Sequence, residues 1–156
     1  MTTTLHTEIE IAATPERVWS VLTDFASFPD WNPFIPRLDG EAAVGARLDT
    51  DLRPPGGRGM RFRPTVLAAT PGRELRWLGH AGPPGLFDGE HAFRIEPLGP
   101  ERVRFVQEER FSGLLAPLVL RFAEAGTRAG FEAMNRALKV RVEASVQSGD
   151  HPEEPA

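Results

Sequence analysis

The chain ends in one long helical pattern, and most of what precedes it alternates as β-strands. Between residues 114 and 146, apolar residues recur at helical spacing, and one face carries Phe131, Met134, Leu138 and Val142. Six earlier segments follow the strand pattern, at residues 5–11, 46–52, 60–68, 73–81, 90–96 and 102–111. A half-apolar sheet and a single long helix bury their apolar faces against each other. We therefore expect an α+β fold with the helix laid across the sheet.

A short amphipathic helix is expected after the first strand. Thr14 is placed as its N-cap and Pro15 as its first residue, and the pattern ends near Asp24. The following residues, up to position 35, hold Phe25, Phe28, Trp31 and Phe34 together with two prolines. Because the prolines prevent a long continuation, this segment is predicted to form one or two short helical turns.

Composition limits the classes of protein and partner. With 156 residues, 40% hydrophobic and 26% charged, the chain resembles an ordinary folded domain. We expect one domain over residues 1–146 and a disordered tail over residues 147–156. The net charge of -4 argues against a nucleic-acid partner. Cysteine is absent, which excludes disulfides and thiolate metal sites.

Targeting and catalytic motifs are also missing from the sequence. No apolar segment is long enough to span a bilayer, and the first residues lack a signal-peptide pattern, so the expected location is the cytoplasm. The sequence has no G-x-S-x-G, H-E-x-x-H, Walker A or G-x-G-x-x-G motif. Its four histidines are too scattered to predict a metal site. We expect neither a metal nor an organic cofactor.

Three polar residues interrupt the apolar rows of the last predicted hairpin. His91 falls in the row of Phe93, and Gln107 and Glu109 fall in the row of Phe105. An antiparallel pairing of the two strands places His91 across from Gln107 or Glu109. A register slip by two residues keeps all three on the same face, so the sequence predicts that they converge.

Three interpretations of this polar group remain open. The side chains satisfy one another's hydrogen bonds, as most buried polar groups do. Alternatively, they line a cavity and orient the hydroxyl or carbonyl group of a ligand. In the third interpretation, His91 and Glu109 perform acid–base catalysis. Glu108 points to the opposite face of its strand, so the two adjacent glutamates do not form a catalytic pair.

Other apolar positions also allow both a core and a ligand-binding role. Trp77 shares the inward-facing row with Leu75, where it either fills the core or stacks over bound rings. The apolar stripe of the long helix has the same two interpretations. Gly126 and Gly130 in that helix either leave room for a ligand or allow the helix to pack closely.

Two stretches resemble a known family. IEIAATPERVWSVLTDFASFPDWNPFI is similar to the opening of the START/Bet v 1-like (SRPBCC) superfamily, in particular its bacterial polyketide cyclase/dehydrase and lipid-transport branch. EERFSGLLAPL and TRAGFEAMNRALKVRVE resemble the last strand and closing helix of that branch. The resemblance covers roughly residues 3–145. It implies a helix-grip fold, in which a curved antiparallel sheet wraps around a long helix and encloses a cavity for hydrophobic molecules.

This resemblance implies a cavity for hydrophobic molecules, and the inward-facing residues suggest its ligand contacts. We expect a hydrophobic or aromatic, lipid-like or polyketide-like small molecule between the sheet and the last helix, in a monomer or homodimer. The aromatic cluster at residues 25–34 then shields the cavity mouth. The expected ligand-binding residues are Trp31, Phe34, Phe62, Trp77, His91, Phe93, Phe105, Gln107, Glu109, Phe131, Met134 and Leu138.

Two other functions remain open at this point. The first is a polyketide cyclase or dehydratase that uses His91 and Glu109 as acid and base. The second is an accessory domain that binds another protein, which predicts a filled interior and an exposed apolar patch. Neither alternative requires an integral membrane association.

Overall fold

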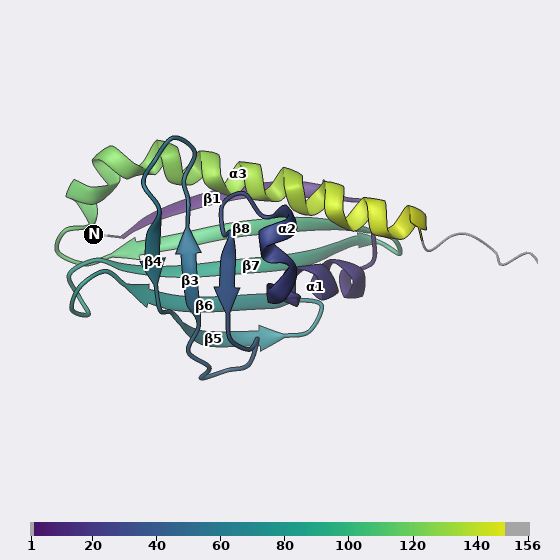
Figure 1. Cartoon of the computed structure of the whole chain (residues 1–156), viewed down its shortest axis with the longest axis horizontal. Helices are drawn as coiled ribbons and strands as arrows, with labels where there is room; N and C mark the ends of the chain where they lie inside the picture. Colours follow the sequence, from purple (N-terminus) through teal and green to yellow (C-terminus); the bar gives the residue numbers. More distant parts are fainter. Residues whose placement is uncertain (1, 149–156) are drawn as a thin grey trace, which may run out of the picture.

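The computed structural model describes residues 2–148 and contains two antiparallel sheets and one long helix (Figure 1). The structural elements in chain order are β1 (Thr3–Ile11), α1 (Pro15–Thr23), the 3-10 turn η1 (Phe25–Ser27), α2 (Phe28–Trp31), β2 (Arg37–Asp39), β3 (Asp49–Leu52), β4 (Met60–Phe62), β5 (Thr65–Thr70), β6 (Glu74–His80), β7 (Asp88–Gly99), β8 (Arg102–Ser112) and α3 (Ala116–Ser148).

The larger sheet has the strand order β1-β8-β7-β6-β5. Its last three strands in the chain follow one another as hairpins, and β1 closes the sheet by pairing with β8. The turn between β5 and β6 contains Gly72, whose φ of +73° lies in the left-handed region that favours glycine. Helix α3 runs along one side of this sheet, antiparallel to β8 (Figure 1). The predicted α+β, helix-grip architecture is confirmed.

The smaller sheet, β2-β3-β4, corrects the strand prediction. The described residues contain eight strands instead of six, because the short strand β2 was missed and the predicted strand 60–68 is two strands in different sheets. The break falls at residues 63–64, because Pro64 has no backbone N–H and cannot donate a hydrogen bond to a neighbouring strand. The small sheet lies in front of the large one, and its strands run steeply across the direction of the strands behind them (Figure 1).

The predicted strand 46–52 is also shorter than expected, since β3 begins at Asp49. The preceding residues instead cover the free edge of β5. Val66 N–H donates to the Ala46 carbonyl at 2.9 Å, and Leu48 N–H donates to the Pro64 carbonyl at 2.8 Å. Covering an edge strand in this way removes unpaired backbone groups that would otherwise promote association with other chains.

The segment after β1 folds as predicted. Thr14 caps α1 by accepting a hydrogen bond from the Arg17 N–H at 3.2 Å, and Pro15 is the first helical residue. The two short turns η1 and α2 carry the aromatic cluster, in which Phe28 packs edge-on against Phe25 and Trp31. Asn32 then ends α2.

Helix α3 buries the predicted stripe completely. Phe131, Met134, Leu138 and Val142 have no exposed side-chain surface, and they pack over the part of the sheet nearest the β7–β8 turn. The helix begins two residues later than expected and extends to Ser148. Residues 149–156, most of the predicted tail, lie outside the described residues.

Candidate functional site

Strand register arranges the inward-facing residues of the large sheet in rows. One row runs Trp77, His91, Glu109 and Leu5 across four neighbouring strands. The next row towards the β7–β8 turn is Leu75, Phe93, Gln107 and Thr7. The next row in the opposite direction is Gly79, Gly89, Phe111 and Thr3. The predicted polar group therefore spans two adjacent rows, with His91 directly opposite Glu109.

A cavity of about 280 Å³ lies over the first and third of these rows. The large sheet, the small sheet and the first half of α3 enclose it. Its volume is close to the lower limit of typical small-molecule sites, roughly 300 Å³. The lining is mainly apolar and comprises Phe34, Thr50, Leu52, Pro54, Met60, Phe62, Pro64, Trp77, Gly79, Ala81, Phe87, Gly89, His91, Glu109, Phe111, Leu115, Val119, Leu120, Ala123 and Thr127.

Small residues explain why this part of the interior is hollow. Gly79 and Gly89 face each other on β6 and β7 and add no side chains to the cavity floor. A Cβ at Gly89 would lie 2.5 Å from Glu109 Oε1, so glycine at this position makes room for the carboxylate. On the opposite side, α3 contributes Ala123 and Thr127, which are short compared with the leucines of the filled core.

Aromatic rings form the walls beside this floor. Trp77 is almost fully buried, and its ring lies 5.0 Å from that of Phe93 and 5.6 Å from that of His91. Phe87 stacks on Phe111 with the ring centroids 5.7 Å apart. Such faces suit a planar ligand, because stacked and edge-on aromatic contacts are both favourable.

The loop that carries Phe87 is fixed by polar contacts around it. His80 Nδ1 lies 2.6 Å from Asp88 Oδ1, and the Gly85 N–H donates to Asp88 at 3.0 Å. The hydrogen bond with His80 is the main cause that lowers the pKa of Asp88. The Leu115 N–H donates to the Leu86 carbonyl, which ties this loop to the start of α3.

A buried chain of hydrogen bonds crosses from the sheet to α3. His91 Nε2 lies 3.0 Å from Gln107 Oε1. Gln107 Nε2 donates to the Phe131 carbonyl at 3.2 Å and to Asn135 Oδ1 at 2.7 Å. Asn135 Nδ2 donates to Thr7 Oγ1 at 3.0 Å. This network supplies hydrogen-bond partners to side chains that water does not reach, since His91, Gln107 and Asn135 are each at most 3% exposed.

Glu109 stands at the cavity end of this chain. Its Oε2 lies 3.5 Å from His91 Nδ1, an ion-pair separation that is longer than an ordinary hydrogen bond. The Glu109 side chain keeps 15% of its surface exposed, against 4% for His91. Glu109 is therefore the member of the polar group that a molecule in the cavity reaches most directly.

Five of the twelve expected ligand-binding residues line the cavity. They are Phe34, Phe62, Trp77, His91 and Glu109. The other seven lie outside its lining and are Trp31, Phe93, Phe105, Gln107, Phe131, Met134 and Leu138. Most of these seven fill the core under the second half of α3. The Gln107 amide forms hydrogen bonds with His91 and Asn135.

Trp31 and Phe34 separate within the aromatic cluster. Trp31 packs on Phe28, and its indole N–H is buried without a hydrogen-bond partner among the described residues. Phe34 instead turns towards the cavity, because Asn32 Oδ1 accepts from the N–H groups of Phe34 and Ile35 and fixes the loop.

Sequence reasoning missed two sets of residues. Thr7 and Asn135 complete the polar network, and each interrupts an apolar face, so the criterion that found His91 also applied to them. The second set lines the cavity from the first half of α3 and the small sheet. No pattern marked these residues as ligand contacts; they are Thr50, Leu52, Val119, Leu120, Ala123 and Thr127.

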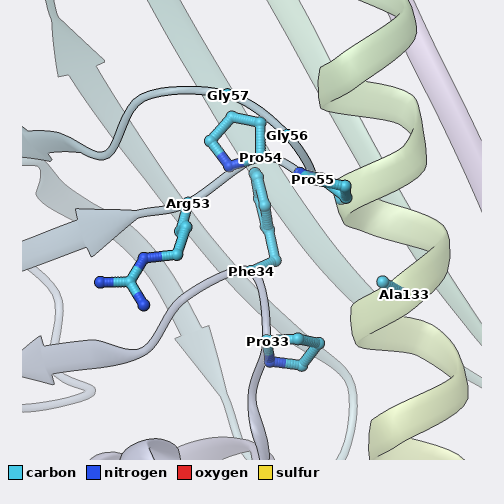
Figure 2. A pocket seen from close by; sticks show the side chains of 9 residues that line it. Pro33, Phe34, Arg53, Pro54, Pro55, Gly56, Gly57 and Ala133 are labelled. Carbon is cyan, nitrogen blue, oxygen red and sulfur yellow. The ribbon is translucent and has the colours of Figure 1, made fainter.

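A second cavity of about 270 Å³ lies on the other side of Phe34 (Figure 2). Phe34 and Pro54 line both cavities and form the partition between them. Figure 2 shows the Phe34 side chain reaching towards Pro54. Pro55 from the loop and Ala133 from α3 also line this cavity. A Cβ at Gly130 would overlap the Phe34 ring, so at this glycine the helix packs closely against the ring.

The small sheet carries a cluster of charged residues. On the small sheet, Arg37 contacts Asp49 and Asp51, and Arg61 also contacts Asp49. Hydrogen bonds from Arg61 and Arg37 hold the pKa of Asp49 well below its usual range. Among residues 2–148, no group of three histidine or acidic side chains is arranged to hold a metal ion, and no helix is long and apolar enough to cross a membrane.

Comparison with protein families identifies the domain. The family described as polyketide cyclase / dehydrase and lipid transport matches residues 2–143. The chain belongs to this family. The predicted resemblance is confirmed, and the polyketide cyclase/dehydrase family and the fold together make the protein a START-type ligand-binding domain. Comparison with curated proteins gives no significant match.

Solved structures agree with this polyketide cyclase/dehydrase fold. The Zhui aromatase/cyclase from a Streptomyces species is 17% identical, with a TM-score of 0.80 over 97% of this chain and 100% of that one. A START superfamily protein from Mycobacterium smegmatis is 25% identical, with a TM-score of 0.70 over 91% and 98%. Norcoclaurine synthase from Thalictrum flavum, in complex with dopamine and hydroxybenzaldehyde, is 17% identical, with a TM-score of 0.70 over 99% and 90%.

Proposed function

We propose that the protein binds a small hydrophobic or aromatic molecule, lipid-like or polyketide-like, in the cavity between the large sheet, the small sheet and the first half of α3. The mainly apolar cavity of about 280 Å³ supports this most directly. Phe34, Phe62 and Trp77 supply apolar contacts, while His91 and Glu109 supply the polar edge. A mainly apolar site with a few convergent polar groups is the usual form of a small-molecule site.

Family membership and neighbouring folds support the same proposal. The family description includes lipid transport, and the norcoclaurine synthase structure contains two aromatic molecules. The volume favours a molecule of one or two rings over a long-chain lipid, since a drug-sized ligand fills several hundred Å³.

Two measurements test the proposal. Native mass spectrometry of freshly purified protein should show a retained small molecule, and calorimetric titration should show that naphthalene or 2-naphthol binds. The variant Ala123→Leu fills part of the cavity and should weaken this binding about tenfold or more. Ala125→Leu adds the same atoms at an exposed position of the same helix and serves as the control. Equal binding by the two variants would exclude this cavity as the site.

A second candidate function is acid–base catalysis, as in a polyketide cyclase or dehydratase. The contact of 3.5 Å between His91 and Glu109 at the cavity wall favours it. In that case His91→Phe and Glu109→Gln should retain ligand binding but lose product formation. Retained turnover in both variants would exclude this role.

The third candidate, a protein-interaction domain, has mixed support. It predicted a filled interior, whereas the interior contains a cavity. It also predicted an exposed apolar patch. Exposed apolar residues do occur at the start of α3 and just before it, namely Leu114, Leu118 and Phe122, which are exposed by 81%, 58% and 80%. The cavity makes ligand binding the better-supported function.

A further inference from the structure

We propose that Gln107 and Asn135 are positioning residues that fix the proton arrangement of His91, and that Glu109 consequently presents a hydrogen-bond acceptor to the cavity. The ligand would then be an uncharged aromatic molecule that carries a hydroxyl group. This inference rests on the proposed binding function and narrows its ligand class.

The Phe131 carbonyl sets that direction. A backbone carbonyl only accepts hydrogen bonds, so the Gln107 atom that lies 3.2 Å from it must be the amide nitrogen. The same nitrogen donates its second hydrogen to Asn135 Oδ1. Asn135 therefore directs its own nitrogen to Thr7 Oγ1. Both amides have one orientation that satisfies all of these contacts.

The orientation of Gln107 determines which nitrogen of His91 carries hydrogen. With its nitrogen fully used, Gln107 turns Oε1 towards His91 Nε2 at 3.0 Å. An amide oxygen accepts only, so His91 Nε2 must be a donor in both the neutral and the charged ring. Nδ1 is left to face Glu109.

Three proton arrangements are compatible with the contact between His91 Nδ1 and Glu109 Oε2. A charged ring donates to the carboxylate, a carboxylic acid donates from Oε2 to the neutral ring, or an ionised Glu109 faces the neutral ring without a shared proton. In all three arrangements Oε1, the other oxygen of Glu109, can only accept. None of them gives the pair a net positive charge.

Glu109 Oε1 is available to a molecule in the cavity. It lies on the cavity side of Gly89, at 2.5 Å from where a Cβ would be. No hydrogen bond to Oε1 from another described residue accompanies the contact of Oε2 with His91. A ligand therefore gains most by donating a hydrogen bond here while its ring lies among Phe62, Trp77 and Phe87.

The same geometry disfavours a carboxylate ligand. Arginine and lysine are absent from the cavity lining, and the His91–Glu109 pair offers no net positive charge. Burying an anion without a counter-charge is costly. The preferred order is therefore 2-naphthol, then naphthalene, then 2-naphthoate, three probes that share one ring system.

Nitrogen-15 NMR of the histidine rings tests the positioning step without any ligand. His91 should be protonated at Nε2, either as the neutral ring or as the imidazolium. A neutral ring protonated at Nδ1 would overturn the proposal. In Gln107→Met, which has similar size but no acceptor oxygen, the neutral ring should show a mixture of both forms.

Calorimetric titration of the full chain tests the ligand class. Wild-type protein should bind 2-naphthol roughly three- to tenfold more tightly than naphthalene, the value of one hydrogen bond. Glu109→Gln should retain this preference, because its amide donates to His91 Nδ1 and still leaves an oxygen at the Oε1 position. Glu109→Met should lose it.

The possible outcomes separate the two proposals. If naphthalene and 2-naphthol bind equally well, or 2-naphthoate binds best, the ligand class is wrong and the binding function stands. If none of the three probes binds, the binding function and the ligand class both fail for aromatic molecules of this size. Equal loss of the hydroxyl preference in Glu109→Gln and Glu109→Met would overturn the acceptor assignment.

Discussion

The two halves of α3 cover the same sheet and enclose different interiors. In the first half Val119, Leu120, Ala123 and Thr127 face a cavity. From Phe131 onwards, in what is called here the second half, Phe131, Met134, Leu138 and Val142 are fully buried in a filled core. The helix itself is continuous, so its geometry does not explain the difference.

The sheet residues beneath each half provide the explanation. Under the second half lie large side chains, including Leu75, Phe93 and Phe105. Under the first half lie Gly79 and Gly89, which leave the floor open. A helix-grip domain can therefore keep a filled core and a cavity under one helix by changing side-chain size along the strands. Variants that treat the two halves differently test this comparison.

The largest effect is expected for Leu138→Asp in the filled half. A buried carboxylate without a partner should destabilise the fold by several kcal/mol, enough to leave much of the protein unfolded. Denaturant unfolding followed by circular dichroism measures this. Leu120→Asp in the cavity half is the matched control and should cost less, since its carboxylate can reach the cavity space. Similar losses for both variants would remove the distinction between the halves.

The glycines of α3 should give effects of opposite sign. Gly130→Ala should destabilise by about 1–3 kcal/mol, because the added methyl overlaps the Phe34 ring. Gly126→Ala should stabilise by about 0.5–1 kcal/mol, since its Cβ would lie 3.8 Å from Pro54 Cβ, an ordinary contact, and alanine favours the helix. Thermal unfolding compares the two. A stabilised Gly130→Ala variant would contradict the close packing at Phe34.

Replacing one threonine in the buried polar network and one beside the cavity tests whether both hydroxyl groups are needed for stability. Thr7→Val removes the acceptor of the buried Asn135 amide and should cost about 1–3 kcal/mol. Thr127→Val in the cavity half should be nearly neutral, because the Thr127 hydroxyl donates to the Ala123 carbonyl of its own helix. Chemical denaturation of both variants checks this. A neutral Thr7→Val would show that the network contributes little to stability.

The smallest effect is expected for His6, which lies on the outer face of the sheet. Its contribution to the pH dependence of stability must be known before any pH dependence is assigned to His91. Hydrogen bonds to Glu8 and Glu108 raise the pKa of His6 above its ordinary value. Folding therefore strengthens proton binding, and the resulting stability is present below about pH 6.5 and is lost as the pH rises through the folded pKa. His6→Gln should flatten this dependence, with a change in Tm of at most about 2 °C for such exposed pairs. An unchanged pH profile in His6→Gln would assign the dependence to another group.

The fold was largely predictable from periodicity because each long element keeps one pattern. The α3 stripe, the hairpins and the capped helix α1 all follow from local spacing. The small sheet was less predictable, since β2 and β4 have three residues each and Pro64 looked like part of a continuous alternation. Strands this short have no periodicity of their own and depend on tertiary contacts.

The candidate site was only partly predictable, for a different reason. Alternation identified which residues face inward, and it correctly grouped His91, Gln107 and Glu109 on one face. It could not distinguish a filled interior from a hollow one, because that depends on the volumes of residues brought together from distant segments. Phe131 and Ala123 both face inward from α3, yet only Ala123 borders the cavity.

Under the proposed binding function, the identities of residues 34 and 130 together set the size of the ligand that the cavity admits. The Phe34 ring occupies the space above Gly130 and separates two cavities of similar volume. Replacing the ring by a smaller side chain would merge the two spaces and admit longer molecules, while also relieving the restriction on residue 130. A lineage could thus change its ligand range through one loop residue and one helix residue, leaving the sheet, the core and the polar network intact.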